Sequence, residues 1–205
     1  DCYRGALERS KSLGYNLELF WIGAEGMTGK RISQILQSRN IIGVVIGPMK
    51  EKMDEFSLEW ENFTSVRIGY SLKDSRITNV ISDQFQNTRW AFEKLIEDGF
   101  RKIGFACPRF LDTRVSNKFT AAYLSLVYEH LGGPPVPMFI DDEPSGDRSA
   151  FLAWYEKHRP EVILAGGRSI YYNFLIENGV SVPEDVQFVS THAEYLRSPV
   201  AGISQ

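Results

Sequence analysis

Apolar and polar positions along the chain alternate between the spacing typical of helices and the spacing typical of strands. Apolar residues that recur every three or four positions predict helices at residues 2–12, 28–38, 54–61, 84–98, 114–131, 147–158 and 169–178. Short apolar runs rich in β-branched and aromatic residues predict strands at residues 15–21, 41–46, 66–70, 79–82, 102–106, 136–140, 162–165, 186–190 and 200–204. This alternation predicts the α/β class, with two βαβ sets in tandem.

The run at residues 41–46 indicates the kind of sheet. Its sequence, Ile-Ile-Gly-Val-Val-Ile, has no polar residue, which is typical of a strand covered on both faces in a parallel sheet. The two βαβ sets meet at Ser82 and Asp83, where a strand leads almost directly into a helix. We therefore expect two Rossmann-like lobes with parallel sheets, residues 1–82 and 83–205, joined by hinge strands at Ser82 and Asp83.

The composition is that of a globular protein. The 205 residues are 43% hydrophobic and 24% charged, which suffices for a substantial core in one large domain or two lobes. The net charge of -3 provides no basic field for phosphates, so nucleic-acid binding by these residues themselves is disfavoured. No run approaches the roughly 18 apolar residues of a membrane span, and the first residues lack a signal-peptide pattern. We expect a soluble protein without membrane contact.

Metal sites and catalytic motifs are not apparent in the sequence. Cys2 and Cys107 lack the paired spacing of a zinc site, and we expect both thiols to be buried in a reduced, cytoplasmic protein. The three histidines are far apart and make no ligand pair. Nucleophile-elbow, phosphate-loop and dinucleotide-binding motifs are missing, and the carboxylates at residues 51–61 and 141–143 are interpreted as solvated faces and turns. We expect no metal, no cofactor and no enzymatic activity.

Four segments, taken in order, resemble the effector-binding domain of LacI/GalR-type transcription regulators. They are residues 5–15, 38–48, 80–106 and 179–205. In the last segment, Val182-Pro183-Glu184-Asp185-Val186 introduces a strand, and a loop containing Pro199 leads to a short strand that ends at Gln205. In the third, Asp83 is followed at the family's spacing by Asn87, Ala91, Leu95, Gly99 and Lys102-Ile103. The resemblance implies the periplasmic-binding-protein-like type I fold.

The same resemblance implies a function and an incomplete first lobe. In the family, the cleft between the lobes binds a small molecule, often a sugar, and a homodimer contacts DNA through an N-terminal helix-turn-helix that this sequence does not include. The family also has a strand before the first helix and a return to the first lobe after the position of Gln205. We therefore expect the isolated chain to be poorly stable, because the strands at residues 15–21 and 41–46 would flank an empty sheet position.

The resemblance places eight residues at or next to family positions that face the ligand, namely Asp1, Gly47, Tyr70, Arg109, Arg114, Ser145, Arg168 and His192. Arg114 lies one residue before the family's cleft arginine, whose own position is occupied by Val115. Independently, open α/β sheets bind ligands beyond the carboxyl ends of their strands. Several of these residues also have an ordinary explanation: Asp1 as a helix cap, Gly47 as a turn and Tyr70 as a packed ring. The arginines of the loop at residues 107–114 are alternatively solvated surface charges.

Three of these positions depart from the usual family pattern. Ser145 stands where relatives often have an aromatic residue, Arg168 falls in place of an Asn-Asp pair, and His192 replaces an aspartate. These changes remove acidic groups and add basic ones, and arginine binds carboxylate or phosphate groups bidentately. The hypothesis is a ligand unlike those of the best-known relatives, with an anionic character.

Two other classes of protein share this fold type. A secreted solute-binding receptor of a transport system has the same fold and cleft without the DNA function, whereas the segments 99–103 and 182–186 favour the regulator. The residues that precede Asp1 in the parent protein would separate the two, because a helix-turn-helix and a signal peptide exclude each other. A flavodoxin-like or other α/β enzyme would need a catalytic constellation, which the sequence does not display.

Overall fold

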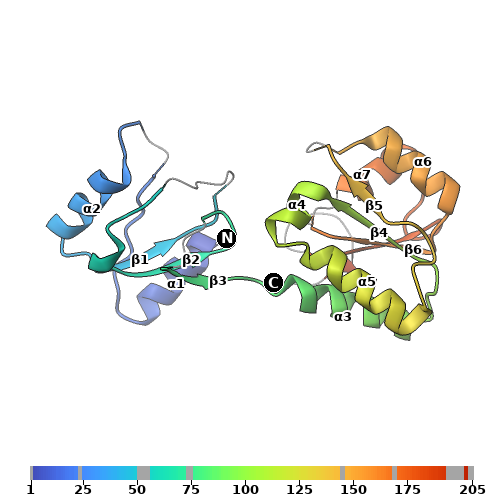
Figure 1. The fold of residues 1–205 in the computed structure, drawn as a ribbon, viewed down its shortest axis with the longest axis horizontal. Helices are drawn as coiled ribbons and strands as arrows, with labels where there is room; N and C mark the ends of the chain where they lie inside the picture. The colour runs from blue at the N-terminus through green and yellow to red at the C-terminus, as the bar shows by residue number, and fades with distance from the viewer. Residues whose placement is uncertain are drawn as a thin grey trace. The chain divides into compact units, whose positions relative to one another are not determined.

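The chain forms two compact units, Asp1–Ser82 and Asp83–Gln205, each with its own parallel sheet (Figure 1). The computed structural model describes residues 2–22, 25–49, 56–72, 76–143, 146–167, 170–192 and 201–202. The predicted α/β class with parallel sheets is confirmed.

The first unit contains a three-stranded sheet in the order β1-β2-β3, with both pairs parallel. Its elements are α1 (Cys2–Ser12), α2 (Gly29–Ser38), β1 (Gly43–Ile46), the 3-10 turn η1 (Trp60–Asn62), β2 (Thr64–Ile68) and β3 (Thr78–Val80). Helix α2 begins where the Thr28 side chain accepts a hydrogen bond from the Arg31 backbone N–H at 3.3 Å. Its apolar face buries Ile32 and Leu36 in the core of this unit, together with Ile46, Leu58, Trp60, Leu72 and Ile77.

Three predictions for the first unit are wrong. Residues 15–21 form no strand with any described residue, and Leu19 and Trp21 are 67% and 74% exposed. The run at 41–46 is not covered on both faces, because Val45 is 50% exposed and β1 pairs only with β2 among the described strands. A strand requires a partner, which the local pattern cannot supply. The described part of the predicted helix at residues 54–61 contains only the beginning of η1.

The second unit contains a five-stranded parallel sheet in the order β5-β4-β6-β7-β8. Its strands are β4 (Ile103–Pro108), β5 (Phe139–Asp141), β6 (Val162–Ala165), β7 (Gln187–Ser190) and β8 (Ala201–Gly202). Its helices are α3 (Gln84–Glu97), α4 (Arg109–Arg114), α5 (Lys118–Leu131), α6 (Arg148–His158) and α7 (Ile170–Glu177). Strand β5 lies on one side of β4 and the later strands lie on the other, so the sheet is doubly wound.

Helices cover both faces of the second sheet (Figure 1). On one face, the ring of Phe105 stacks on Tyr123 of α5 with centroids 4.8 Å apart, and the Tyr123 hydroxyl donates to the Ile103 carbonyl at 2.8 Å. On the other face, α6 and α7 contribute an aromatic cluster in which Phe151 stacks on Tyr171 at 4.8 Å. Both sheet faces are therefore buried, as a parallel sheet requires.

The helix predicted at residues 114–131 is α5, but it begins later than predicted, at Lys118. Helix α4 ends at Arg114, and Ser116 and Asn117 adopt left-handed backbone with φ of +61° and +58° before α5 begins. The predicted loop at 107–114 is correspondingly the end of β4 followed by α4. Asparagine and serine tolerate this conformation better than branched residues do, but the apolar spacing on either side conceals the break.

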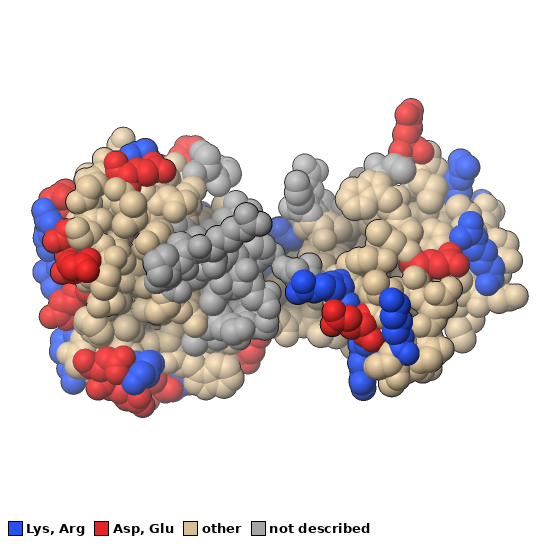
Figure 2. Space-filling model, turned by 180° about the vertical axis from the view of Figure 1, so that it is seen from behind, with Lys and Arg blue, Asp and Glu red and all other residues tan. Residues whose placement is uncertain are grey.

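The surface carries mixed charges. On the face shown in Figure 2, the described Lys and Arg side chains are interleaved with Asp and Glu side chains. None of the described helices has the length and apolar character needed to cross a membrane.

Of the two cysteines, Cys107 is buried as predicted, whereas Cys2 is exposed on α1 and its predicted burial is wrong.

Candidate ligand-binding site at the carboxyl ends of the second sheet

The order of the second sheet reverses at β4, between β5 on one side and β6 on the other. At such a switch point the chain leaves neighbouring strands in opposite directions, which opens a crevice beyond their carboxyl ends. The residues that follow the four strands at this edge are Arg109 after β4, Asp142 after β5, Gly166 and Gly167 after β6, and Thr191 and His192 after β7.

Two glycines form the edge after β6. A Cβ atom on Gly166 would lie 2.8 Å from Sγ of Cys107, and one on Gly167 would lie 2.9 Å from Cδ1 of Leu111. Gly167 also has a φ of +89°, in the region that favours glycine. Packing therefore favours glycine at position 166, and the backbone conformation favours glycine at position 167.

The Cys107 thiol packs against Gly166 at this edge. Its Sγ atom donates to the Gly166 carbonyl at 3.3 Å, and the side chain is fully buried. Burial raises the pKa of the Cys107 thiol far above its ordinary value, so the sulfur stays protonated. A protonated, buried thiol is a weak nucleophile, and Cys107 acts as a packing residue.

Hydroxyl groups tie the end of β7 to the end of β6. The Ser190 Oγ atom donates to the Gly167 carbonyl at 3.0 Å and accepts from the His192 backbone N–H at 3.1 Å. Thr191 accepts from the Gly167 N–H at 3.1 Å through Oγ1. These bonds fix the backbone of His192, whose side chain is half-buried, next to the two glycines.

Arg109 is the first residue of α4, and its Nε atom donates to the Asp142 carboxylate in an ion pair. The pair raises the pKa of the Arg109 guanidinium and lowers the pKa of the Asp142 carboxyl group. Both side chains are exposed, at 59% and 71%. Water screens such a pair, so it contributes little to stability and can exchange for ligand groups.

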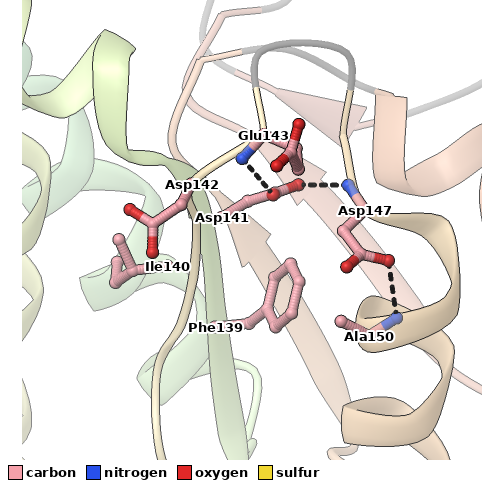
Figure 3. Close-up of a pocket in the computed structure, with 7 residues that line it drawn as sticks. All are labelled: Phe139, Ile140, Asp141, Asp142, Glu143, Asp147 and Ala150. Carbon is pink, nitrogen blue, oxygen red and sulfur yellow. Dashed lines mark hydrogen bonds between the residues drawn. The ribbon is translucent and has the colours of Figure 1, made fainter.

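A pocket of about 220 Å³ lies beside this ion pair, at the carboxyl end of β5 (Figure 3). It is lined by Phe139, Ile140, Asp141, Asp142, Glu143, Asp147 and Ala150. Asp141 is 3% exposed, and its carboxylate accepts from the backbone N–H groups of Glu143 at 3.0 Å and Asp147 at 2.9 Å. Asp141 therefore shapes the loop, while Asp142 and Glu143 remain exposed at the pocket.

The interpretation of residues 141–143 as solvated is thus wrong for Asp141. Its burial follows from its place as the last residue of β5, where the turn that follows needs an acceptor for its backbone N–H groups. The order of residues, an aspartate ending a strand and a second aspartate capping the next helix at Asp147, is the signal that could have indicated it.

The residues predicted for the site are found in both units. In the second unit, Arg109 and His192 follow β4 and β7, but Arg114 ends α4, about 140° around the helix axis from Arg109, and is half-buried. In the first unit, Gly47 follows β1 directly and Tyr70 comes two residues after β2, so both lie at the carboxyl ends of that sheet. Three predicted residues lie outside the described part of the chain, namely Asp1, Ser145 and Arg168.

The two predicted hinge residues lie where the two units meet in the chain, and Gly47 is not constrained by local packing. Ser82 and Asp83 are the last and first residues of the two units, and the Asp83 side chain caps α3 by accepting from the Gln86 N–H at 3.1 Å. A Cβ atom on Gly47 would meet nothing within 4 Å. Local packing therefore does not require a glycine at that position.

Comparison with known proteins gives no match to a family model or to a curated protein sequence. Solved structures do match. The transcription regulator CcpA of Lactococcus lactis gives a TM-score of 0.69 at 17% identity, covering 99% of this chain and 78% of that one. The chain has the fold of LacI-family transcription regulators.

Two further structures agree. A LacI-family regulator protein from Rhizobium etli gives a TM-score of 0.72 at 18% identity and covers 98% of this chain and 78% of that one. A periplasmic binding protein/LacI transcriptional regulator from Alkaliphilus metalliredigens, complexed with D-xylulofuranose, gives 0.63 at 19%, with 97% and 76% covered. The fold implied by the sequence resemblance is confirmed.

Proposed function

We propose that the chain is the ligand-sensing part of a LacI/GalR-type transcription regulator, which binds a small sugar or sugar-like molecule and performs no catalysis. The observation that carries the proposal is the fold shared with such regulators over 97–99% of the chain. The switch-point edge of the second sheet supports it, because the exposed side chains of Arg109 and Asp142 lie there beside a pocket.

The carboxyl-end edge of the second sheet suits a ligand that carries hydroxyl groups. The exposed Arg109–Asp142 pair offers a fork of N–H donors next to carboxylate acceptors, which matches two neighbouring hydroxyls of a sugar ring. Glu143 adds a second exposed carboxylate, and Phe139 adds an apolar surface for the ring. Because Asp142 already balances the charge of Arg109, a neutral polyhydroxyl ligand suits this edge better than the anionic ligand hypothesised from the sequence.

Regulation requires that the ligand bind one state of the regulator more tightly than another. We infer that the DNA contacts belong to a separate helix-turn-helix, and that the regulator acts as a cytoplasmic homodimer. The rival function is a solute-binding receptor, and the name of the Alkaliphilus protein combines both classes. Fold alone does not separate them.

Isothermal titration calorimetry with a panel of pentoses, hexoses and their phosphates tests the binding proposal. We expect a neutral sugar to bind, and Arg109→Met and Asp142→Asn each to weaken its affinity about tenfold or more, since hydrogen bonds to charged groups are the strong ones. The matched control is Arg159→Met, because Arg159 also pairs with an exposed acid, Glu156, but follows α6 at the opposite edge of the sheet. The control should bind like the wild type. Equal affinity of wild type and Arg109→Met for every bound sugar would contradict the proposed site.

Operator binding in the full-length protein separates a regulator from a receptor. We expect the sugar identified by calorimetry to change the affinity for operator DNA at least fivefold, as measured by fluorescence anisotropy at fixed salt. A sugar that binds without any change in DNA affinity would support the receptor instead.

A further inference from the structure

Arg67 on β2 is a charged side chain that has no counter-charge among the described residues. It is half-buried, and its Nε atom is fully buried with no hydrogen-bond partner. In the part of the chain that the structure describes, its side chain makes neither a hydrogen bond nor an ion pair. A guanidinium that has lost part of its hydration normally gains a carboxylate or phosphate partner in return.

The neighbours of Arg67 in the sheet are also polar and unpaired. Arg67 pairs in register with Asn79 on β3, the adjacent strand in Figure 1, so the two side chains stand next to each other on one face. Ser65 lies two residues earlier on β2 and points to the same face. Asn79 Oδ1 and Ser65 Oγ are buried and have no hydrogen-bond partner among the described residues.

This polar row lies on the core face of the first sheet. Arg67 pairs in register on its other side with Ile46, which is 7% exposed and belongs to the hydrophobic core. Electrostatic interactions and hydrogen bonds are stronger in such surroundings than in water. A ligand that satisfied these groups would therefore be held by more than a surface charge.

The guanidinium is reachable from solvent. Arg67 is half-buried, and among the described residues Nε is the one Arg67 nitrogen that is buried without a partner, which leaves the Nη end of the guanidinium as the part that faces outward. The Asn79 amide can turn by 180°, which exchanges its oxygen for an N–H donor. An anion that enters from the exposed end of Arg67 would then meet a guanidinium, an amide N–H and a hydroxyl, and this set of donors fits an oxyanion.

We propose that Arg67, Asn79 and Ser65 form a second binding site, which takes a small oxyanion in the form of a carboxylate or phosphate group. The anion supplies the missing counter-charge through the planar fork of Arg67. This site belongs to the first unit and is independent of the sugar site proposed at the carboxyl ends of the second sheet.

The test is a titration of the ¹⁵N-labelled chain with sodium phosphate, and separately with sodium acetate, at constant ionic strength. The Nε–Hε resonance of Arg67 is assigned by its loss in Arg67→Lys. We expect this resonance to shift saturably at millimolar phosphate, acetate or both, and the anion that succeeds identifies the group. Arg67→Lys should weaken the binding measured by calorimetry about tenfold, because lysine lacks the fork. Asn79→Ala, which keeps the charge, should weaken it severalfold.

Arg109→Lys is the matched control, because it alters the arginine of the other proposed site and should leave the Arg67 titration unchanged. A shift that rises linearly without saturation, or affinities that are equal in wild type, Arg67→Lys and Asn79→Ala, would overturn the proposal. If Arg67→Lys does not fold, Asn79→Ala and the wild-type titration decide the question. Failure of this site would leave the sugar titration with Arg109→Met unaffected, so the two proposals fail separately.

Discussion

Replacing Gly166 by alanine probes the packing that supports the candidate site. The added Cβ would lie 2.8 Å from Cys107 Sγ, 3.1 Å from Cys107 Cβ and 3.1 Å from Cζ of Phe105. Both neighbours are 0% exposed, on strand β4 between β5 and β6, so neither can move into solvent. Overpacking of a rigid core costs about 1–3 kcal/mol, and we expect Gly166→Ala to fall in the upper half of that range.

Urea unfolding followed by circular dichroism measures this cost as a lower transition midpoint at an unchanged m value. Cys107→Ala removes the sulfur and hence the shortest contact, so Gly166→Ala in that background should cost roughly 1 kcal/mol less than in the wild type. A Gly166→Ala chain within about 0.5 kcal/mol of the wild type, or a cost that is the same with and without the sulfur, would refute the packing described at this edge.

Three further predictions follow from burial and hydrogen bonding. In the folded chain iodoacetamide should alkylate Cys2 and spare Cys107, because Cys107 is buried and its thiol pKa is raised; rapid loss of both thiols by mass spectrometry would contradict this. Glu161 accepts from two backbone N–H groups, which lower its pKa, so its stabilising effect is present above the ordinary glutamate pKa of about 4.3 and is lost as the pH falls through the lower folded value. Relative to Glu161→Gln, the wild type should therefore lose stability in urea melts as the pH is lowered across that range, and parallel pH profiles would argue against it. Phe151→Ala should cost about 3–5 kcal/mol and Val45→Ala less than about 0.5 kcal/mol in the same assay, because Phe151 is 0% exposed and Val45 is 50% exposed; similar costs would be incompatible with the core described.

The sequence predicts the fold well where the structure depends on local spacing. Helix α3 and strand β6 lie where the apolar pattern places them, because one amphipathic stripe or one short apolar run specifies each. The strand predicted at residues 15–21 is wrong because strand pairing is not a local property of the sequence. The predicted start of the helix at residue 114 is wrong because Ser116 and Asn117, in left-handed backbone, separate α4 from α5.

The candidate site was predictable only in part. Strand ends can be located from the sequence, so Arg109 and His192 could be placed at the edge of the second sheet. The ion pair between Arg109 and Asp142 joins residues 33 positions apart, and no local pattern reveals it. The row of Arg67 and Asn79 depends on the register of β2 against β3, which a sequence without a structure does not specify.

The most direct test of the central claim is a crystal structure of the chain with the sugar that binds best in the calorimetric panel. The sugar should lie beyond the carboxyl ends of β4 and β5, with its hydroxyl groups hydrogen-bonded to Arg109 and Asp142. A sugar bound in any other place, with the Arg109–Asp142 pair undisturbed, would contradict the proposed site.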